Sequence, residues 1–435
     1  MRLALAITLA ATPMPLSAQE AIDTTPVTVL RAARLFDGRA EASLKDAVIV
    51  ISAGRIQAVG SGLPVPPGAV VHDLGDATLL PGFIDSHVHL GGEAGDNWYR
   101  DTVEGMRRTL AEDAIRATAF ARRTLQAGFT TVRNLGASDF VDVGLRNAID
   151  AGVVEGPRML TAAHSLGARG GHCDETGFPY NFFGHETGIA QGIAAGADQF
   201  RDAVRLQHKY GASVIKVCAT GGVLSLGDAV DTPQLTQSEM EALVDEAHRL
   251  GLKAAAHAHG ALGAKVAIRA GIDSIEHGSF LDEEAHGLMK QKGTYLVPTA
   301  MAVEYTGRRP RNYPEEIARK AKAAADSHAA ALRRGIQLGV KIAFGTDSGV
   351  SPHGLNAQEF RLLVDHGLSP AGALRSAGPA AADLLGVSKE VGSLEVGKAA
   401  DIVAVPGDAL ADIKATERVL FVMKGGRVYR NDRGR

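Results

Sequence analysis

The sequence contains almost no cysteine. Only Cys173 and Cys218 are present, so no disulfide framework can hold the chain together. Both lie near candidate active-site segments, and an oxidising compartment would permit a bridge between them. We expect them to be two free structural cysteines.

Aromatic residues and clustered positive charge are also scarce. Aromatics make up 5% of the 435 residues, and the formal net charge is -3 without any long basic run. This composition argues against a nucleic-acid partner, which requires a basic surface. The 51 glycines suit a protein with many tight connections between strands and helices. The chain is long enough for a barrel of about 250 residues and a small appended domain.

Long apolar runs are absent beyond the N-terminus. A helix that spans a bilayer needs about 20 apolar residues, and the run from Leu3 to Ala11 is shorter. Arg2 before this run, and the small residues and prolines that follow it up to Gln19, are typical of a secretory signal peptide. The alternative interpretation is a buried N-terminal strand. We expect a signal peptide over residues 1–18, a mature chain that begins near Gln19, and a periplasmic or secreted protein without a membrane anchor.

The two ends of the remaining chain share one pattern. Segments 24–80 and 389–435 alternate apolar and polar residues around tight turns, which is typical of short hairpin strands. We expect these segments to form one composite β domain.

The middle of the chain, residues 81–388, has a different rhythm. Short β-rich runs alternate with helical stretches, as in βα units on a parallel sheet. The plainest helix begins at Pro314 and ends at Gly335 or Gly339. Eight runs are expected to form strands: 82–89, 130–135, 158–164, 213–219, 252–258, 273–278, 294–299 and 341–346. The predicted fold class is therefore α/β, a (β/α)8 TIM barrel with a small β-sandwich-like domain built from both chain ends.

Two histidines lie on the first predicted barrel strand. His87 and His89 are two residues apart, so strand alternation sends both side chains to one face. At the carboxyl end of a barrel strand this face points into the mouth, where barrel enzymes keep their active sites. Imidazole pairs in such a place suit zinc or a similar metal. A His-x-His pattern alone is also compatible with incidental strand histidines.

Three further metal-binding side chains end other predicted strands. His257, His277 and Asp347 each follow an apolar strand and precede a glycine or polar residue. The four histidines and the aspartate should therefore meet at the same barrel mouth, which predicts a metal site.

Lys216 lies within the apolar strand 213–219. As an ammonium it has no lone pair and cannot bind a metal. Burial beside cations would lower its pKa, and the neutral amine could then take up carbon dioxide to form a carbamate with two metal-binding oxygens. The alternative is a lysine that pairs with an acid or reaches the surface.

These segments together resemble the amidohydrolase superfamily. The resemblance rests on 81–89 (PGFIDSHVH), 214–217 (VIKV), 257–260 (HAHG), 275–278 (IEHG) and 345–348 (GTDS). Within the superfamily, 218–225 (CATGGVLS) and 247–251 (AHRLG) resemble the branch of metal-dependent dipeptidases and carboxypeptidases. This branch includes Xaa-Pro dipeptidases, arginine/lysine carboxypeptidases and ochratoxin-hydrolysing amidases.

The resemblance implies a ligand set and a reaction. His87, His89 and Asp347 would hold one divalent ion, His257 and His277 would hold a second, and carboxylated Lys216 would bridge both. Zinc is the expected metal. The implied reaction is cleavage of the amide or peptide bond before a C-terminal amino acid by a metal-bridging hydroxide, with Asp347 transferring the proton.

Four residues are additional site candidates. His259 and His164 are candidates for catalysis, and Arg169 and His172, in the loop after the third strand, are candidates for binding the substrate carboxylate. A hydrogen-bonded loop histidine, or an arginine that pins the loop, is the alternative for each.

Three rival functions remain. Deaminases of the superfamily lack the strand-four lysine and carry a glutamate at the position of Gly260, so the sequence argues against them. A hydrolase of cyclic amides or imides and a non-catalytic metal-binding barrel are the other two. The expected partner is a small-molecule or short-peptide substrate, and we expect the protein to form a homo-oligomer.

Overall fold

The computed structural model describes residues 27–180, 182, 184–308 and 312–433. The predicted signal peptide over residues 1–18 lies outside this part of the chain. No helix among the described residues is long and apolar enough to cross a membrane.

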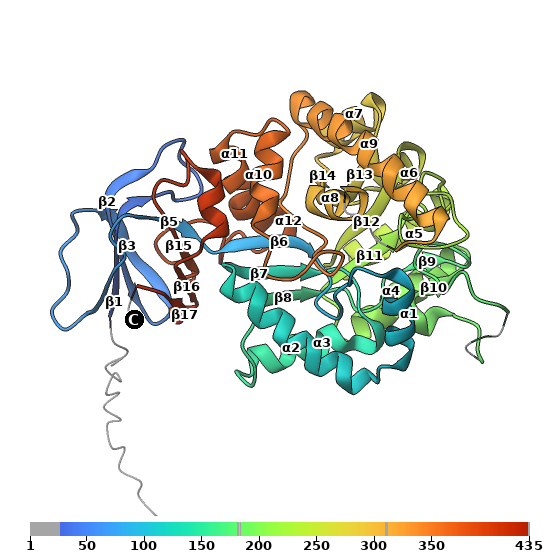
Figure 1. Ribbon diagram of the computed structural model, residues 1–435, viewed down its shortest axis with the longest axis horizontal. Coiled ribbons are helices and arrows are strands. Elements are labelled where there is room, and N and C mark those ends of the chain that lie inside the picture. The colour runs from blue at the N-terminus through green and yellow to red at the C-terminus, as the bar shows by residue number, and fades with distance from the viewer. Residues whose placement is uncertain (1–26, 181, 183, 309–311, 434–435) are drawn as a thin grey trace, which may run out of the picture.

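The two chain ends form a single sheet of eight strands, as expected from their shared pattern. The strand order is β17-β16-β15-β5-β1-β2-β3, and β4 pairs with β1. Figure 1 shows this sheet at one end of the molecule. Strand β15 from the C-terminal end runs antiparallel to β5 from the N-terminal end, which joins the two segments. The strands are β1 (Thr28–Leu35), β2 (Leu44–Ser52), β3 (Arg55–Ser61), β4 (Val70–Asp73), β5 (Ala77–Pro81), β15 (Ile402–Pro406), β16 (Phe421–Lys424) and β17 (Arg427–Asn431).

Seven of the eight predicted barrel strands are present as strands. They pair in parallel in two groups, β6-β7-β8 and β11-β12-β13-β14. Their bounds are β6 (Phe83–Val88), β7 (Phe129–Asn134), β8 (Arg158–Thr161), β11 (Val214–Cys218), β12 (Lys253–Gly260), β13 (Ser274–Phe280) and β14 (Tyr295–Val297). The third strand is shorter than the predicted 158–164.

A few backbone hydrogen bonds at each junction join the two groups of barrel strands. The predicted eighth strand, 341–346, makes bridges rather than a regular ladder: Leu296 N–H donates to Lys341 O, and Asp347 N–H donates to His87 O, each at 2.8 Å. At the other junction, Leu166 N–H donates to Lys216 O at 2.8 Å. Segment 341–346 therefore connects β14 to β6, and the residues after β8 connect β8 to β11, so that eight segments form a ring.

Helices follow the strands and cover the outside of this ring (Figure 1). The predicted long helix is α9, which begins after Pro314 and ends at Gly339, where a φ of 74° suits a glycine. The helices are α1 (Trp98–Arg107), α2 (Leu110–Gln126), α3 (Val141–Asp150), α4 (Ala197–Lys209), α5 (Gln237–Arg249), α6 (Ala261–Ala270), α7 (Glu283–Lys292), α8 (Ala300–Arg308), α9 (Glu315–Leu338), α10 (Gln358–Asp365), α11 (Pro370–Arg375) and α12 (Ala381–Leu385).

The expectation of two free cysteines is wrong. Cys173 and Cys218 form a disulfide that spans 45 residues of sequence. The loop that follows the short strand β9 (Gly167–Ala168) folds back onto the end of β11, and spacing along the chain gave no sign of this approach. Closing a loop of this length stabilises a native chain by about 4 kcal/mol in the chain-entropy account.

Candidate metal and catalytic site

The six predicted metal ligands meet at the carboxyl ends of the barrel strands. His87 and His89 lie at the end of β6, Lys216 on β11, and the others follow along β12, β13 and the segment after Phe344. All six line one cavity of about 260 Å³. The lining residues are His87, His89, Ser165, His172, Cys173, Lys216, Cys218, Val223, Leu224, His257, His259, His277, Ala302, Val303, Thr306, Ala324, Asp347 and Val350.

Three of these side chains converge in a first cluster. Asp347 Oδ1 lies 3.4 Å from His87 Nε2 and 3.4 Å from His89 Nε2. The two Nε2 atoms are 3.3 Å apart. Three potential ligand atoms therefore face one another, as a metal ion requires.

The remaining ring nitrogens of this cluster identify the tautomers. His87 Nδ1 lies 2.8 Å from a Glu276 carboxylate oxygen, and His89 Nδ1 lies 3.3 Å from the carbonyl of Gly136. Both partners only accept, so each Nδ1 carries the proton and each Nε2 carries a lone pair. Burial lowers the pKa of His89 to about 3 and that of His87 well below its ordinary value, so neither ring gains a second proton near neutral pH. Two imidazole lone pairs and a carboxyl group that face one another form a donor set that fits a divalent ion.

A second cluster contains His257, His259 and His277, whose ligand atoms lie within 4.8 Å of one another. His257 Nε2 donates to the carbonyl of Gly221 at 3.1 Å, which leaves Nδ1 with a lone pair. His277 Nδ1 lies 2.7 Å from the hydroxyl of Thr299. His259, which the sequence suggested for catalysis, is as close to this cluster as the two predicted ligands.

Lys216 lies beside the first cluster and forms no ion pair with an acidic side chain among the described residues. Its side chain is buried, and its Nζ lies 3.5 Å from His87 Nε2. It forms no salt bridge with any residue that the structure describes. Burial lowers the pKa of Lys216 to about 8, although the carboxylates of Glu276 and Asp347 oppose this shift. The alternative of a lysine paired with an acid or reaching the surface therefore does not hold.

Two of the candidate ligands have strained backbones. His277 has a φ of 70° and Asp347 a φ of 56°, in the left-handed region that favours glycine. Such a conformation costs on the order of 1–3 kcal/mol and is concentrated at functional sites. Both side chains line the cavity.

A buried ion pair between Arg133 and Glu276 contacts His87 of the first cluster. Arg133 on β7 donates to Glu276 Oε1 at 2.9 Å, while the second oxygen of Glu276 accepts from His87. Arg133 also donates to the carbonyl of Ser86 at 2.6 Å. Neither Arg133 nor Glu276 is among the site residues predicted from the sequence. Two oppositely charged residues on apolar strands were the only signal that could have identified the pair.

The other candidates differ in position. His172 lines the cavity and its ring centroid lies 4.3 Å from that of His257. His164 is not among the residues that line the cavity, and its Nε2 accepts a hydrogen bond from the backbone N–H of Asp139. Arg169 is exposed and also lies outside the lining. The structure therefore brings His172 and His259 to the site but not His164 or Arg169.

Known proteins are similar to this chain over nearly its whole length. The profile of the amidohydrolase family matches residues 78–429. Ochratoxinase from Aspergillus niger is 33% identical over 430 residues, covering 94% of this chain and 88% of its own length. Imidazolonepropionase from Pseudomonas entomophila is 28% identical over 428 residues, covering 88% of this chain and 92% of its own. A Xaa-Pro dipeptidase crystallised with methionine in its active site has a TM-score of 0.88 at 38% identity, covering 93% of this chain and 100% of that one.

The Glu276 contact gives a prediction about metal affinity. Glu276→Gln keeps the shape of the side chain but removes the charge that holds His87 Nδ1–H and pairs with Arg133. We expect the divalent-metal affinity to fall by about 10- to 100-fold, the usual effect of losing a partner of a ligating histidine. Competition with a coloured chelator measures it, and circular dichroism verifies the fold. Glu241→Gln, at an exposed site on α5, is the matched control. An affinity equal to that of the control would contradict the proposed role of Glu276.

Proposed function

Since this chain belongs to the amidohydrolase family and is a hydrolase of amide C–N bonds, we propose that it uses two divalent metal ions to cleave the bond before a C-terminal amino acid. The observation that carries this proposal is the convergence of potential ligand atoms in two clusters that line one cavity, with Lys216 beside the first cluster. Zinc suits a site of imidazoles and carboxylates. Two such ions, when bound, would activate water as a nucleophile and polarise the scissile carbonyl.

Lys216 supports the proposal of two ions because it can connect the clusters. Its neutral amine would attack carbon dioxide, forming an N–C bond and releasing one proton to leave a carbamate anion. This step converts a group without a metal-binding lone pair into one with two oxygens. Burial lowers the pKa of Lys216 to about 8 and so raises the fraction of neutral amine that the step needs.

Asp347 is the residue that we propose moves a proton between the nucleophile and the leaving group. One of its oxygens faces His87 and His89, and the other accepts no hydrogen bond from a described residue. The side chain lines the substrate cavity. It could therefore accept a proton and donate it to the departing amine nitrogen.

The cavity wall and the relatives support a short amide substrate. Six of the lining residues are apolar aliphatic: Val223, Leu224, Ala302, Val303, Ala324 and Val350. Such a wall suits an apolar side chain beside the reacting amide. An ochratoxinase and a Xaa-Pro dipeptidase are similar to this chain over nearly its whole length.

Deamination is disfavoured by the space around Gly260. A Cβ at this position would overlap the backbone carbonyl of Asp231, so the glutamate of the superfamily's deaminases has no room here. The non-catalytic alternative is excluded by family membership. The resemblance to imidazolonepropionase leaves cyclic amides as the second substrate class to test.

The disulfide supports the proposed location outside the cytoplasm. Disulfides such as Cys173–Cys218 persist in oxidising compartments and are rare in the cytosol. We therefore retain the proposal of a periplasmic or secreted protein. Assembly into a homo-oligomer stays a prediction.

Lys216 provides the test of the bridge. Lys216→Ala should lose both bound metal and activity, and short carboxylic acids should restore part of each because they supply the missing oxygens. Lys216→Arg retains positive charge and length but cannot carry a carbamate. Elemental analysis and turnover of a dipeptide library measure the outcome. Normal activity in Lys216→Arg would disprove the carbamate.

Recognition of a C-terminal carboxylate gives a second prediction. The kcat/KM of substrates with a free carboxylate should be about 10- to 150-fold higher than that of the corresponding C-terminal amides. A charge-assisted hydrogen bond that is retained in the transition state accounts for a difference of this size. Arg169 is exposed, so it can contribute only if it turns toward the cavity. Arg169→Ala should then remove the preference for the acid. Equal kcat/KM for acid and amide would identify a general amidase, and an unchanged preference in Arg169→Ala would exclude Arg169.

A further inference from the structure

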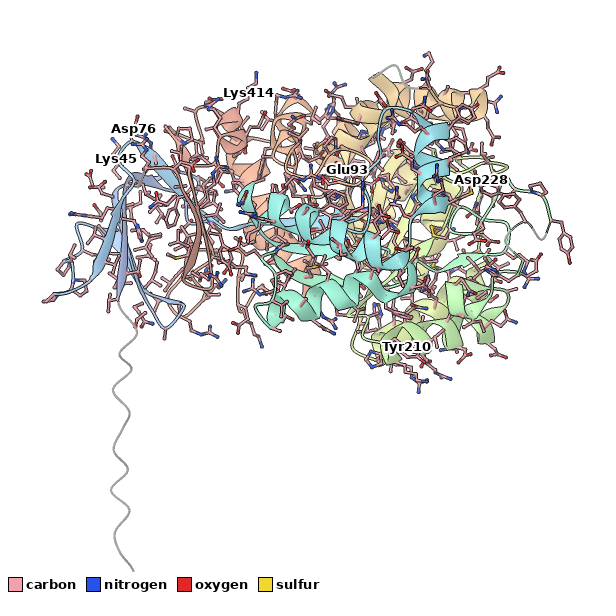
Figure 2. The ribbon with its side chains drawn as sticks, turned by 60° about the horizontal axis from the view of Figure 1, so that its bottom comes forward. Lys45, Asp76, Glu93, Tyr210, Asp228 and Lys414 are labelled. Atoms are coloured by element: carbon pink, nitrogen blue, oxygen red, sulfur yellow. A yellow bond between two sulfur atoms is a disulfide. The ribbon has the colours of Figure 1, made fainter. Side chains whose placement is uncertain are left out.

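A line of hydrogen bonds leads from helix α9 to the cavity. Lys320 Nζ donates to Asp228 Oδ1 at 2.8 Å, the Ser225 hydroxyl lies 2.8 Å from the same carboxylate, and Ser225 Oγ lies 2.8 Å from His172 Nδ1. The side chains of Lys320 and Asp228 are each only 6% exposed. Figure 2 shows Asp228 at the opposite end of the molecule from Lys45 and Asp76 on the terminal sheet.

The direction of these hydrogen bonds follows from the donors available. Burial alone would raise the pKa of Asp228, but hydrogen bonds from Lys320 and Ser225 outweigh it and hold this pKa below its ordinary value. The ionised carboxylate only accepts, so Ser225 gives it its single hydroxyl proton. The oxygen of Ser225 must then accept from His172 Nδ1–H. His172 Nε2 therefore carries the lone pair of the neutral ring.

Other contacts hold the same ring in place. The backbone N–H of His172 donates to Gln234 Oε1 at 2.9 Å. A Cβ at Gly222 would overlap the ring, so the absence of a side chain there makes room for it. The next residue, Cys173, is tied to the end of β11 by the disulfide. No described residue donates to His172 Nε2.

We propose that Ser225, Asp228 and Lys320 are positioning residues that fix His172 with Nε2 as a hydrogen-bond acceptor for an N–H or O–H donor of the substrate. This inference rests on the proposed function for the identity of the reaction. It changes the role that sequence analysis gave to His172, because a lone pair attracts a donor and repels a carboxylate.

A double-mutant cycle tests the positioning role. Ser225→Ala should lower kcat/KM by about 10- to 100-fold, the loss of one hydrogen bond of the charge-assisted kind. His172→Ala should cost at least as much, and the double variant should cost no more than His172→Ala alone. Ser225→Thr, which keeps the hydroxyl, should restore the rate. Ser238→Ala, at an exposed site on α5, is the control.

Two measurements separate this role from a general structural one. Metal content by elemental analysis should stay the same in Ser225→Ala. In histidine-labelled protein, 15N shifts assigned with His172→Ala should show Nδ1 protonated in the native chain and a mixture of tautomers in Ser225→Ala.

Additive losses in the cycle, or loss of metal in Ser225→Ala, would overturn the proposal. So would an Nε2-protonated ring in the native protein, which can be detected without any substrate. Absence of turnover on every amide would contradict the proposed function instead, and the tautomer would still decide whether the network positions His172.

Discussion

Lone pairs that point into one buried space are the constraint on which this site depends. His87, His89 and His257 each give their ring proton to an acceptor outside the cavity, namely Glu276, Gly136 and Gly221. The nitrogens left inside cannot satisfy one another. The surrounding protein therefore holds an arrangement that is unfavourable by itself and becomes favourable when cations bind.

Contacts elsewhere in the fold hold these side chains in this unfavourable arrangement. Parallel strands bring distant residues to one edge, and His277 and Asp347, whose backbones are left-handed, line the cavity there. The buried pair of Arg133 and Glu276 holds His87 from the strand side. On the opposite side, the disulfide and Lys320 restrain the loops that carry His172 and Ser225.

Strand alternation and strand ends were sufficient to predict the arrangement of the ligand candidates. His87 and His89 share a face because they are two residues apart, and His257, His277 and Asp347 each end an apolar run. Glu276 was not predicted because regular strand alternation would place its side chain on the face opposite that of His277. The positive φ at His277 breaks this alternation. The disulfide and the contacts of Ser225 depend on how long loops fold, which local sequence patterns do not encode.

The number of metal ions that full activity requires tests the central claim most directly. Protein stripped of metal should be titrated with zinc while bound metal, by elemental analysis, and amide hydrolysis are followed together. Activity should rise until two ions are bound per chain, because the potential ligand atoms form two clusters, with Lys216 beside the first. Full activity with one ion bound per chain, unchanged by further zinc, would contradict the account.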